Sequence, residues 1–292
     1  MGQLANRLGK SFRHLRKWAR REGVSCFRVY DRDIPEEPVT VDWYEGRALV
    51  QCAQKHTDDR SAWMARVEQE VRDALEPTEV FLKDRRPGGQ YQAEGSPAHE
   101  FEVGEGNLRF LVNLTDYHDS GLFLDHRDTR AMVRERAAGK RVLNLFCYTG
   151  SFSVYAADGG ARATVSVDLS NTYLEWSERN FRLNGLDLES NRLERADVLA
   201  WLEEGHGLFD LIVCDPPTFS NSKKMSGHFD VAEHHPILIR ACLERLTPEG
   251  ELLFSTNHQR FTLSPEFRGQ ELDTVPVDFR NRKAHRLWRL TR

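Results

Sequence analysis

The segment of residues 209–219 constrains the fold of this chain more than any other. Its apolar run from Leu211 to Cys214 ends in Asp215-Pro216-Pro217. Prolines are excluded from the interior of a central strand because they have no backbone N–H group to donate. A buried strand must therefore end at Cys214 and leave Asp215 at its carboxyl edge. Open α/β sheets bind their ligands at that edge, so the segment predicts an α/β fold with a functional site at Asp215.

A strand, a glycine turn and a helix precede this segment. Residues 142–146 predict a short buried strand, Gly150 lies in the turn that follows, and a helix is expected through Ala157. A second predicted strand, residues 163–168, ends in Asp168, 18 positions after Gly150. A carboxylate at this place commonly accepts the hydroxyl groups of a ribose. The patterns G-x-G-x-x-G and G-x-x-x-x-G-K-[ST] do not occur, which favours an adenosine ligand without phosphates over a dinucleotide or ATP.

A third acid, Asp197, follows a helix expected over residues 172–184 and a short connection. It precedes a helical run, so it is an N-cap, a ligand contact or both. The order of strands, helices and acids resembles the Rossmann-like class I S-adenosylmethionine-dependent methyltransferases. By that resemblance, residues 144–151 surround the methionine part of the cofactor, Asp168 binds the ribose, Asp197 binds the adenine amino group, and Asp215 lies at the reacting end.

Composition agrees with a soluble protein of two domains. The 292 residues suffice for a smaller N-terminal α+β domain, residues 1–118, and a catalytic domain, residues 119–292. No apolar run approaches the roughly 20 residues that span a bilayer, and no signal-peptide core is present, so we expect a cytoplasmic protein without a membrane partner. The five cysteines are scattered without metal-ligand spacing, which favours reduced thiols and no metal site.

The net charge of −4 conceals a strongly basic N-terminus. Residues 1–30 carry eight basic side chains and one acid, a net charge of +7, against −11 for the remainder. Apolar residues recur at helical spacing from Leu4 to Ala19, which predicts an amphipathic basic helix. A solvated helix face is one interpretation. The one-sided charge favours the other, contact with RNA phosphates through three basic residues, Arg13, Arg16 and Lys17.

A small α+β unit is predicted after this helix. Strands are expected over residues 26–30, 47–52 and 80–83, a helix over 62–75, and a hairpin of residues 101–103 and 108–112 around the turn 104–107. Residues 83–91 form a basic loop with an aromatic residue. Such a loop suits RNA contact through Lys83, Arg85 and Arg86, although an exposed loop without a partner is an equal alternative.

Four motifs are similar to those of a known RNA-modifying family. They lie at residues 113–117 (Asn-Leu-Thr-Asp-Tyr), 121–127 (Gly-Leu-Phe-Leu-Asp-His-Arg), 144–151 and 215–223. Together they resemble the RlmK family, the guanine-N7 methyltransferase half of the bifunctional bacterial 23S rRNA methyltransferases. Residues 173–176 and 180–186 extend the resemblance, which covers nearly the whole chain from Asn6. That family's guanine-N2 methyltransferase half is missing, so we expect it as a separate or fused partner, the chain being either a standalone form or a part of a longer protein.

The resemblance implies S-adenosylmethionine as cofactor, 23S rRNA as partner and guanine N7 as the methylated atom. Fourteen residues are implied to bind the cofactor: Phe123, Asp125, Arg127, Asn144, Phe146, Tyr148, Thr149, Gly150, Ser151, Asp168, Leu169, Asp197, Val198 and Asp215. The implied catalytic segment comprises Asp215, Pro216, Pro217, Thr218 and Phe219. Flanking RNA phosphates have three candidate partners, Arg127, Lys223 and Lys224.

Cysteine and aromatic positions weigh against two related reactions. Methylation of cytosine C5 needs a thiolate, and residues 254–257, where related enzymes carry it, contain no cysteine. Cys147 and Cys214 are interpreted as packed small residues. Methylation of an exocyclic amine places an aromatic directly after the second proline, whereas Thr218 stands there and Phe219 follows. Guanine-N2 or cytosine-C5 methylation of rRNA and a catalytically silent RNA-binding assembly factor stay as alternatives.

Guanine N7 demands less of the protein. Its lone pair is already nucleophilic, so no general base is needed and catalysis depends on in-line positioning. We expect Asp215 to accept hydrogen bonds from guanine N1 and N2 or to stabilise the positive charge that develops on the ring. Phe219 or Tyr148 is expected to stack on the base, which must leave the RNA helix to reach the site.

Overall fold

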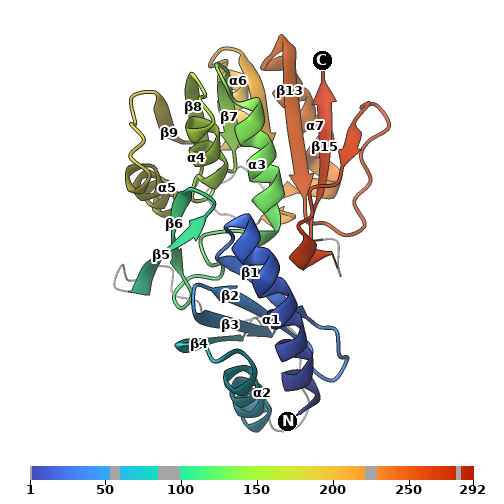
Figure 1. The fold of residues 1–292 in the computed structure, drawn as a ribbon. Coiled ribbons are helices and arrows are strands. Elements are labelled where there is room, and N and C mark those ends of the chain that lie inside the picture. Colours follow the sequence, from blue (N-terminus) through green and yellow to red (C-terminus); the bar gives the residue numbers. More distant parts are fainter. Residues whose placement is uncertain (1, 53–59, 85–98, 221–228, 281–283) are drawn as a thin grey trace. The chain divides into compact units, whose positions relative to one another are not determined.

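The computed structural model describes residues 2–52, 60–84, 99–220, 229–280 and 284–292. They form two compact units, Met1–Leu124 with Val277–Arg282, and Asp125–Pro276 with Lys283–Arg292 (Figure 1). The domain boundary between residues 118 and 119 stays a prediction. The return of the chain to the first unit at Val277 has no signal in the sequence.

The second unit is built on a seven-stranded sheet in the order β14-β15-β13-β10-β7-β8-β9. The five strands from β13 to β9 in this order run parallel, while β15 is antiparallel to both of its neighbours. This arrangement confirms the predicted Rossmann-like α/β class. The strands are β7 (Arg141–Leu145), β8 (Ala163–Asp168), β9 (Asn191–Arg195), β10 (Phe209–Cys214), β13 (Leu246–Thr256), β14 (Gln270–Leu272) and β15 (Arg286–Thr291).

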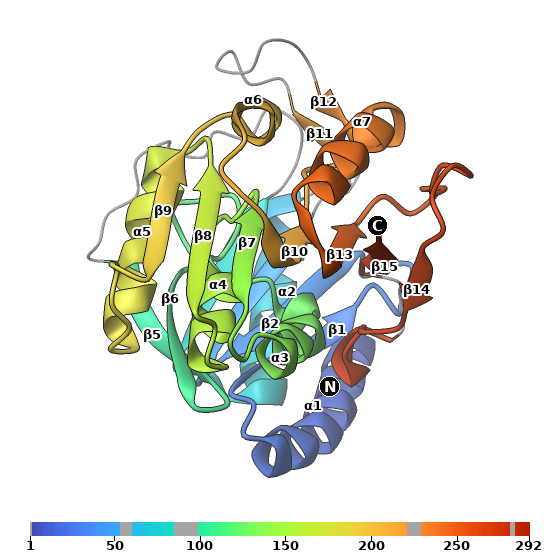
Figure 2. The same cartoon turned by 90° about the horizontal axis from the view of Figure 1, so that it is seen from above.

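Helices cover both faces of this sheet, as the view in Figure 2 shows. Alternate residues of a strand point to opposite faces. Leu143 and Ile212 therefore pack in one cluster with α6 and α7, whereas Val142 and Leu211 pack in another with α3 and α4. Continuous apolar strands are what a parallel sheet buried on both faces requires. The helices are α3 (Arg127–Arg136), α4 (Ser151–Asp158), α5 (Asn171–Leu183), α6 (Val198–Glu204) and α7 (Val231–Glu244).

The order of the strands reverses between β7 and β10. From β7 the chain continues to β8 and β9 on one side of the sheet and later to β10 and β13 on the other. Adjacent connections thus leave in opposite directions, and in open α/β sheets the ligand-binding crevice lies at the carboxyl ends of two such strands. The turn after β7 and the Asp-Pro-Pro sequence after β10 both reach this edge.

The first unit combines a four-stranded sheet, ordered β1-β2-β3-β4, with two helices and a hairpin. Leu4, Leu8 and Phe12 of α1 share a core with Val67 and Val71 of α2, which explains the apolar spacing of the basic helix. The elements are α1 (Gln3–Glu22), β1 (Cys26–Asp31), β2 (Val39–Tyr44), β3 (Arg47–Cys52), α2 (Arg60–Leu75), β4 (Glu79–Asp84), β5 (Glu100–Glu105) and β6 (Leu108–Asn113).

Six strands, β2, β9, β11 (Phe219–Ser220), β12 (Phe229–Asp230), β14 and β15, are not predicted from the sequence. The connection expected to be short before Asp197 contains β9, an edge strand with the polar sequence Asn-Arg-Leu-Glu-Arg. An edge strand buries little and therefore carries a weak apolar signal. The sequence of β2 contains the charged residue Asp42, which interrupts the apolar pattern of a buried strand. In the structure Asp42 is buried and pairs with Arg28 of β1 at 2.8 Å. None of the described helices is long and apolar enough to cross a bilayer.

Candidate active site

The turn between β7 and α4 approaches α5 closely. Gly150 has φ +75°, and a Cβ atom built on it would lie 1.9 Å from Ser177 Oγ and 2.9 Å from Ser177 Cβ. Phe146 and Tyr148 in the same turn also have positive φ, +55° and +51°. Left-handed backbone at bulky residues costs energy and is concentrated at functional sites. The backbone conformation of this turn is therefore closely constrained by its neighbours.

Asp168, the last residue of β8, holds this turn. Its Oδ2 accepts a hydrogen bond from the Tyr148 backbone N–H at 2.9 Å, and its Oδ1 accepts one from Ser170 N–H at 2.9 Å. Burial raises the pKa of Asp168, and the N–H groups of Ser170 and Tyr148 partly oppose that increase. The predicted carboxylate thus lies beside the predicted turn, where it can also accept from a ligand.

Aromatic rings flank the same turn. The Tyr148 ring meets Tyr173 edge-on at 4.6 Å between centroids, and Trp176 lies 6.4 Å away. Both partners come from α5, whose N-terminus is capped by Ser170. These contacts fix the Tyr148 side chain on the α5 side of the turn.

Asp197 caps α6 as the sequence indicated. Its Oδ1 accepts from the backbone N–H groups of Leu199 and Ala200 at 3.1 and 3.2 Å. Because both capping bonds use one oxygen, the cap is compatible with a ligand contact through the other. The role toward adenine stays a prediction.

The Asp-Pro-Pro segment ends β10 as expected. Asp215 Oδ1 accepts from Ser255 Oγ at 2.5 Å, and Asp215 Oδ2 lies 3.5 Å from His126 Nε2. Pro216 is buried, whereas Pro217 and Phe219 are exposed, Phe219 to 54%. Thr218 Oγ1 donates to Asn257 Oδ1. The segment therefore presents a carboxylate and an aromatic ring beyond a strand end whose shape the prolines restrict.

A model of the S-adenosylmethionine-dependent methyltransferases matches residues 27–277 of this chain. The chain belongs to that family. Its cofactor is S-adenosylmethionine, as the resemblance implied.

Two curated relatives are highly similar to this methyltransferase. Ribosomal RNA large subunit methyltransferase K of Neisseria meningitidis is 46% identical over 98% of this chain and 86% of that protein. Ribosomal RNA large subunit methyltransferase K/L of Pseudomonas putida is 47% identical, but the chain spans 41% of its length. The resemblance to the K family is confirmed.

Solved structures agree with the family assignment. An S-adenosylmethionine-dependent methyltransferase of Streptococcus mutans superposes with a TM-score of 0.79 and 27% identity, covering 98% of this chain and 80% of that one. A methyltransferase complexed with SAH gives a TM-score of 0.78 and 27% identity, with 99% and 82% coverage. A tRNA m1G37 methyltransferase of M. jannaschii shares the fold alone, at 14% identity and a TM-score of 0.59.

The crevice of this methyltransferase fits an adenosyl ligand. Gly150 has no side chain, and Ser177 Oγ occupies the space that a Cβ atom would need. At this position the turn therefore offers only backbone atoms to a ligand. Carboxylates of Asp168 and Asp197 accept hydrogen bonds of the kind that ribose hydroxyls and an adenine amine donate. Cations and glycines arranged for a pyrophosphate do not occur in this turn.

Several predicted site residues lie behind the crevice. Asn144 is buried in β7 and donates to Ser153 Oγ at 2.9 Å, and Thr149 is buried with its carbonyl accepting from Asn180 Nδ2 at 2.9 Å. The side chains of Asn144 and Asn180 thus anchor α4 and the turn. Val198 belongs to the sheet core. Four other predicted cofactor contacts are half-buried: Asp125, Phe146, Ser151 and Leu169. Phe123, also predicted, is exposed and belongs to the first unit.

Two predicted RNA contacts are wrong. Lys83 lies in β4 and is buried, and its Nζ donates to the Tyr117 carbonyl at 2.7 Å, so the ammonium group does not face solvent. Arg127 is buried in the first turn of α3, so it is not on the surface where an RNA phosphate would pass. Its predicted contact with the cofactor stays a prediction. The other loop residues proposed for RNA, Arg85, Arg86, Lys223 and Lys224, lie outside the described residues.

Cys147 and Cys214 do not have the surroundings of reactive thiols. All five cysteines are free and buried, and burial raises the pKa values of Cys147 and Cys214 well above the usual range. A thiol that resists ionisation is a poor nucleophile. The interpretation of Cys147 and Cys214 as packed small residues is confirmed.

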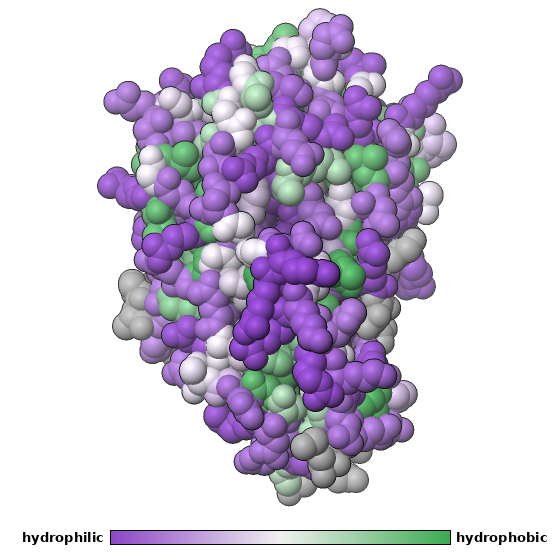
Figure 3. Space-filling view, in the orientation of Figure 1, coloured by the Kyte–Doolittle hydropathy of each residue, from purple (hydrophilic) through white to green (hydrophobic). Residues whose placement is uncertain are grey.

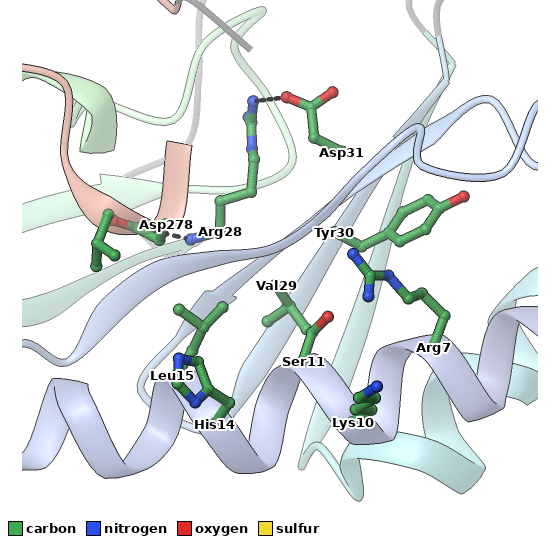
Figure 4. Close-up of a pocket in the computed structure, with 11 residues that line it drawn as sticks. Arg7, Lys10, Ser11, His14, Leu15, Arg28, Val29, Tyr30, Asp31 and Asp278 are labelled. Carbon is green, nitrogen blue, oxygen red and sulfur yellow. Dashed lines mark hydrogen bonds and ion pairs between the residues drawn. The ribbon is translucent and has the colours of Figure 1, made fainter. Parts of the chain in front are cut away.

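The first unit displays the predicted basic helix. Strongly hydrophilic side chains gather over α1 in Figure 3. Among the residues of this helix, Arg13, Arg16 and Lys17 are exposed. A pocket of about 250 Å³ lies beside the helix, where Arg7, Lys10 and His14 face β1 (Figure 4). Arg7 pairs there with Asp33 at 2.6 Å, and Arg28 pairs with Asp42 at 2.8 Å. Since these two cations are neutralised, the exposed row of α1 is the stronger candidate for an anion contact.

Sequence reasoning missed three residues around Asp215. Ser255, His126 and His285 lie within reach of this carboxylate or of one another. His126 lies in the motif Gly-Leu-Phe-Leu-Asp-His-Arg, but the sequence assigns it no role. His285 had no signal, because it comes from the far end of the chain just before β15.

Proposed function

We propose that this methyltransferase modifies N7 of a guanine in 23S ribosomal RNA. The names of the two curated relatives support the substrate class, since both are large subunit ribosomal RNA methyltransferases. The choice of N7 rests on the segment from Asp215 to Phe219. A hydrogen bond holds the carboxylate of this segment, its aromatic ring is exposed, and all five cysteines of the chain are buried. Such a site suits a base atom that is nucleophilic without loss of a proton, as guanine N7 is.

The cofactor supplies an electrophilic methyl group on a sulfonium sulfur. We assign the β7–α4 turn to its methionine part, with Phe146, Tyr148 and Gly150 offering backbone. Asp168 is assigned to the ribose and Asp197 Oδ2 to the adenine amine. Asp168 suits this role because two of its hydrogen bonds, from the Tyr148 and Ser170 backbone N–H groups, already fix its orientation.

The guanine is assigned to the end of β10. Asp215 would either accept from guanine N1–H and N2–H, which orients the base from the edge opposite N7, or stabilise the positive charge that develops on the imidazole ring. Phe219 is assigned to stacking on the extruded base, as its exposure permits. No residue has to remove a proton, since N7 carries none, and the rate depends on alignment.

The RNA backbone is assigned in part to α1. Arg13, Arg16 and Lys17 are exposed on one helix whose opposite face is buried in the first unit. Cations held in a row on a rigid helix release counterions when they meet phosphates, which makes such binding salt-dependent.

Chemistry of the product tests the proposal. Methylation at N7 places a fixed positive charge on the imidazole ring, so the modified guanine is reducible and its glycosidic bond labile. We expect 23S rRNA treated with the protein and cofactor to break at one guanine after borohydride and aniline. The Asp215→Ala variant should bind cofactor but leave the RNA intact, with turnover lowered about 100-fold or more.

Two other outcomes identify the alternatives. Methyl incorporation without a cleavable site contradicts N7 and favours guanine N2 or cytosine C5, which mass spectrometry of the nucleosides separates. Cofactor binding without methyl incorporation into any rRNA substrate favours a silent RNA-binding assembly factor.

A further inference from the structure

Helix α5 meets the turn between β7 and α4 through a buried face. Ser177 and Asn180 of this helix lie three positions apart, so they are on the same side of it, and both are fully buried. Ser177 closely approaches Gly150, and Asn180 Nδ2 donates a hydrogen bond to the Thr149 carbonyl at 2.9 Å. The helix thus contacts two successive residues of the turn.

The hydrogen bond from Asn180 holds one end of a peptide group. The Thr149 carbonyl and the Gly150 N–H belong to the same peptide, and this N–H donates to the Cys147 carbonyl at 2.9 Å. The next carbonyl, that of Gly150, accepts from Val154 N–H at 2.9 Å as α4 begins. The carbonyl that Asn180 reaches therefore lies at the junction between the turn and the helix.

The orientation of this peptide is not fixed by the turn itself. A peptide group beside a glycine can rotate at low cost, because glycine adopts both signs of φ. Rotation of the peptide between Thr149 and Gly150 would exchange the directions of its carbonyl and its N–H and so change the surface that the turn offers. Hydrogen bonds at its two ends, from Asn180 and to Cys147, select the observed orientation.

The preceding peptide is held by Asp168. Its Oδ2 accepts from the Tyr148 N–H at 2.9 Å, and Asp168 is half-buried, so its carboxylate can also meet a ligand. Asn180 is 0% exposed and has no such access. It can influence a ligand only through the turn. Left-handed backbone at Phe146 and Tyr148 requires such support from several sides.

Asn180 is itself fixed near the end of α5. Asn184, the C-cap residue of this helix, donates from Nδ2 to the Asn180 carbonyl at 2.8 Å, and the neighbouring Phe181 is fully buried. Both asparagines belong to the segment 180–186 that extends the resemblance to the RlmK family. The contact with Thr149 gives one of them a physical role.

We propose that Asn180 is a positioning residue for the cofactor, which holds the turn through the Thr149 carbonyl in the orientation that receives the amino-acid end of S-adenosylmethionine. The inference rests on the proposed assignment of this turn to the methionine part. Without the hydrogen bond both orientations of the peptide become populated, and the apparent affinity falls in proportion to the competent fraction. Bound cofactor selects the competent orientation again, so the loss affects Kd and the KM for cofactor more than kcat.

Two variants that remove the donor test this role. Asn180→Ala deletes the amide, whereas Asn180→Leu deletes it but keeps a side chain of similar size, so agreement between them separates the hydrogen bond from a cavity. Calorimetric titration of the full chain should give a Kd for S-adenosylmethionine about 10-fold higher in both. 5′-Methylthioadenosine, which lacks the amino-acid group, should bind within about 3-fold of wild type. Without cofactor, the Gly150 amide should exchange its hydrogen faster in both variants.

Asn191 provides a matched control. It is 5% exposed and begins the edge strand β9, and its Nδ2 donates to the Asp187 carbonyl at 2.8 Å. Asn191→Ala therefore removes a buried hydrogen bond of the same kind that does not touch the turn. It should lower the stability, as Asn180→Ala does, but leave both Kd values within about 3-fold of wild type.

The results that would overturn the inference are specific. Unchanged affinity for S-adenosylmethionine in Asn180→Leu, equal losses for S-adenosylmethionine and 5′-methylthioadenosine, or the same loss in Asn191→Ala would remove the positioning role. Failure of both Asn180 variants to fold would also remove it, because the contact would then serve folding. Weaker cofactor binding in Gly150→Ala with none in the Asn180 variants would overturn this inference but keep the assignment of the turn. These measurements contain no RNA, so they do not depend on which guanine atom is methylated.

Discussion

The contact between Gly150 and α5 makes a quantitative prediction for Gly150→Ala. The added Cβ would meet Ser177 Oγ at 1.9 Å and Ser177 Cβ at 2.9 Å. The hydroxyl can rotate away, but the Cβ is attached to the α5 backbone, so the turn or the helix has to shift. The alanine must also adopt φ near +75°.

The two costs can be separated with a matched glycine. Left-handed backbone costs an alanine about 1–2 kcal/mol, and overpacking adds about 1–3 kcal/mol, so we expect Gly150→Ala to lower the free energy of unfolding by about 2–5 kcal/mol. Gly185 has φ +67° and no atom within 4 Å of its added Cβ. Gly185→Ala should therefore lose only the backbone part, about 1–2 kcal/mol.

Denaturant unfolding and calorimetric titration with S-adenosylmethionine measure the outcome. Because the shifted turn belongs to the assigned cofactor surface, Gly150→Ala should also weaken cofactor binding about 10-fold or more, whereas Gly185→Ala should not. Combining Gly150→Ala with Ser177→Gly removes both close atoms and leaves Ser177 Cα at 3.5 Å, an ordinary contact. The double variant should lose less free energy of unfolding than the sum of the losses in Gly150→Ala and Ser177→Gly. Equal stabilities of Gly150→Ala and Gly185→Ala, with cofactor affinity unchanged in both, would refute the close approach.

Three further predictions concern the other assigned residues. Asp168→Ala should weaken S-adenosylmethionine binding about 10-fold to 100-fold in a calorimetric titration, and an unchanged affinity would remove Asp168 from the site. Replacing Cys147 and Cys214 by alanine should leave turnover within about tenfold, apart from a loss of stability; a covalent complex with 5-fluorocytosine RNA would contradict the inert thiols. Neutralising three of the exposed cations of α1, Arg13, Arg16 and Lys17, should lower RNA affinity and reduce the salt slope by up to about 2 units while cofactor affinity stays constant. An unaltered slope would mean that this helix face is only solvated.

Local patterns in the sequence determined the elements that frame the site. The apolar run before Asp215 and the prolines after it allow one outcome, a buried strand that stops at the sheet edge. Gly150 and Asp168 were recognisable because a close turn and a strand-end acid have few chemical substitutes. The amphipathic spacing of α1 was equally clear, since a helix face that packs must repeat every three to four residues.

Only the tertiary structure decided which side chains face outward. Lys83 and Arg127 have the composition of RNA contacts, yet both are buried, because the exposure of a charge depends on what packs over it rather than on its neighbours in sequence. Asn144 likewise serves α4 through Ser153.

The environment of Asp215 depends on tertiary structure most of all. His126 and His285 are 159 positions apart in the sequence but stack at 4.0 Å, and Ser255 reaches the same carboxylate from β13. No periodicity or spacing encodes such a meeting, because it arises from the order of strands in the sheet and the return of the chain into β15. The sequence by itself therefore determined where this methyltransferase places its carboxylates along the chain. The fold decided what holds them.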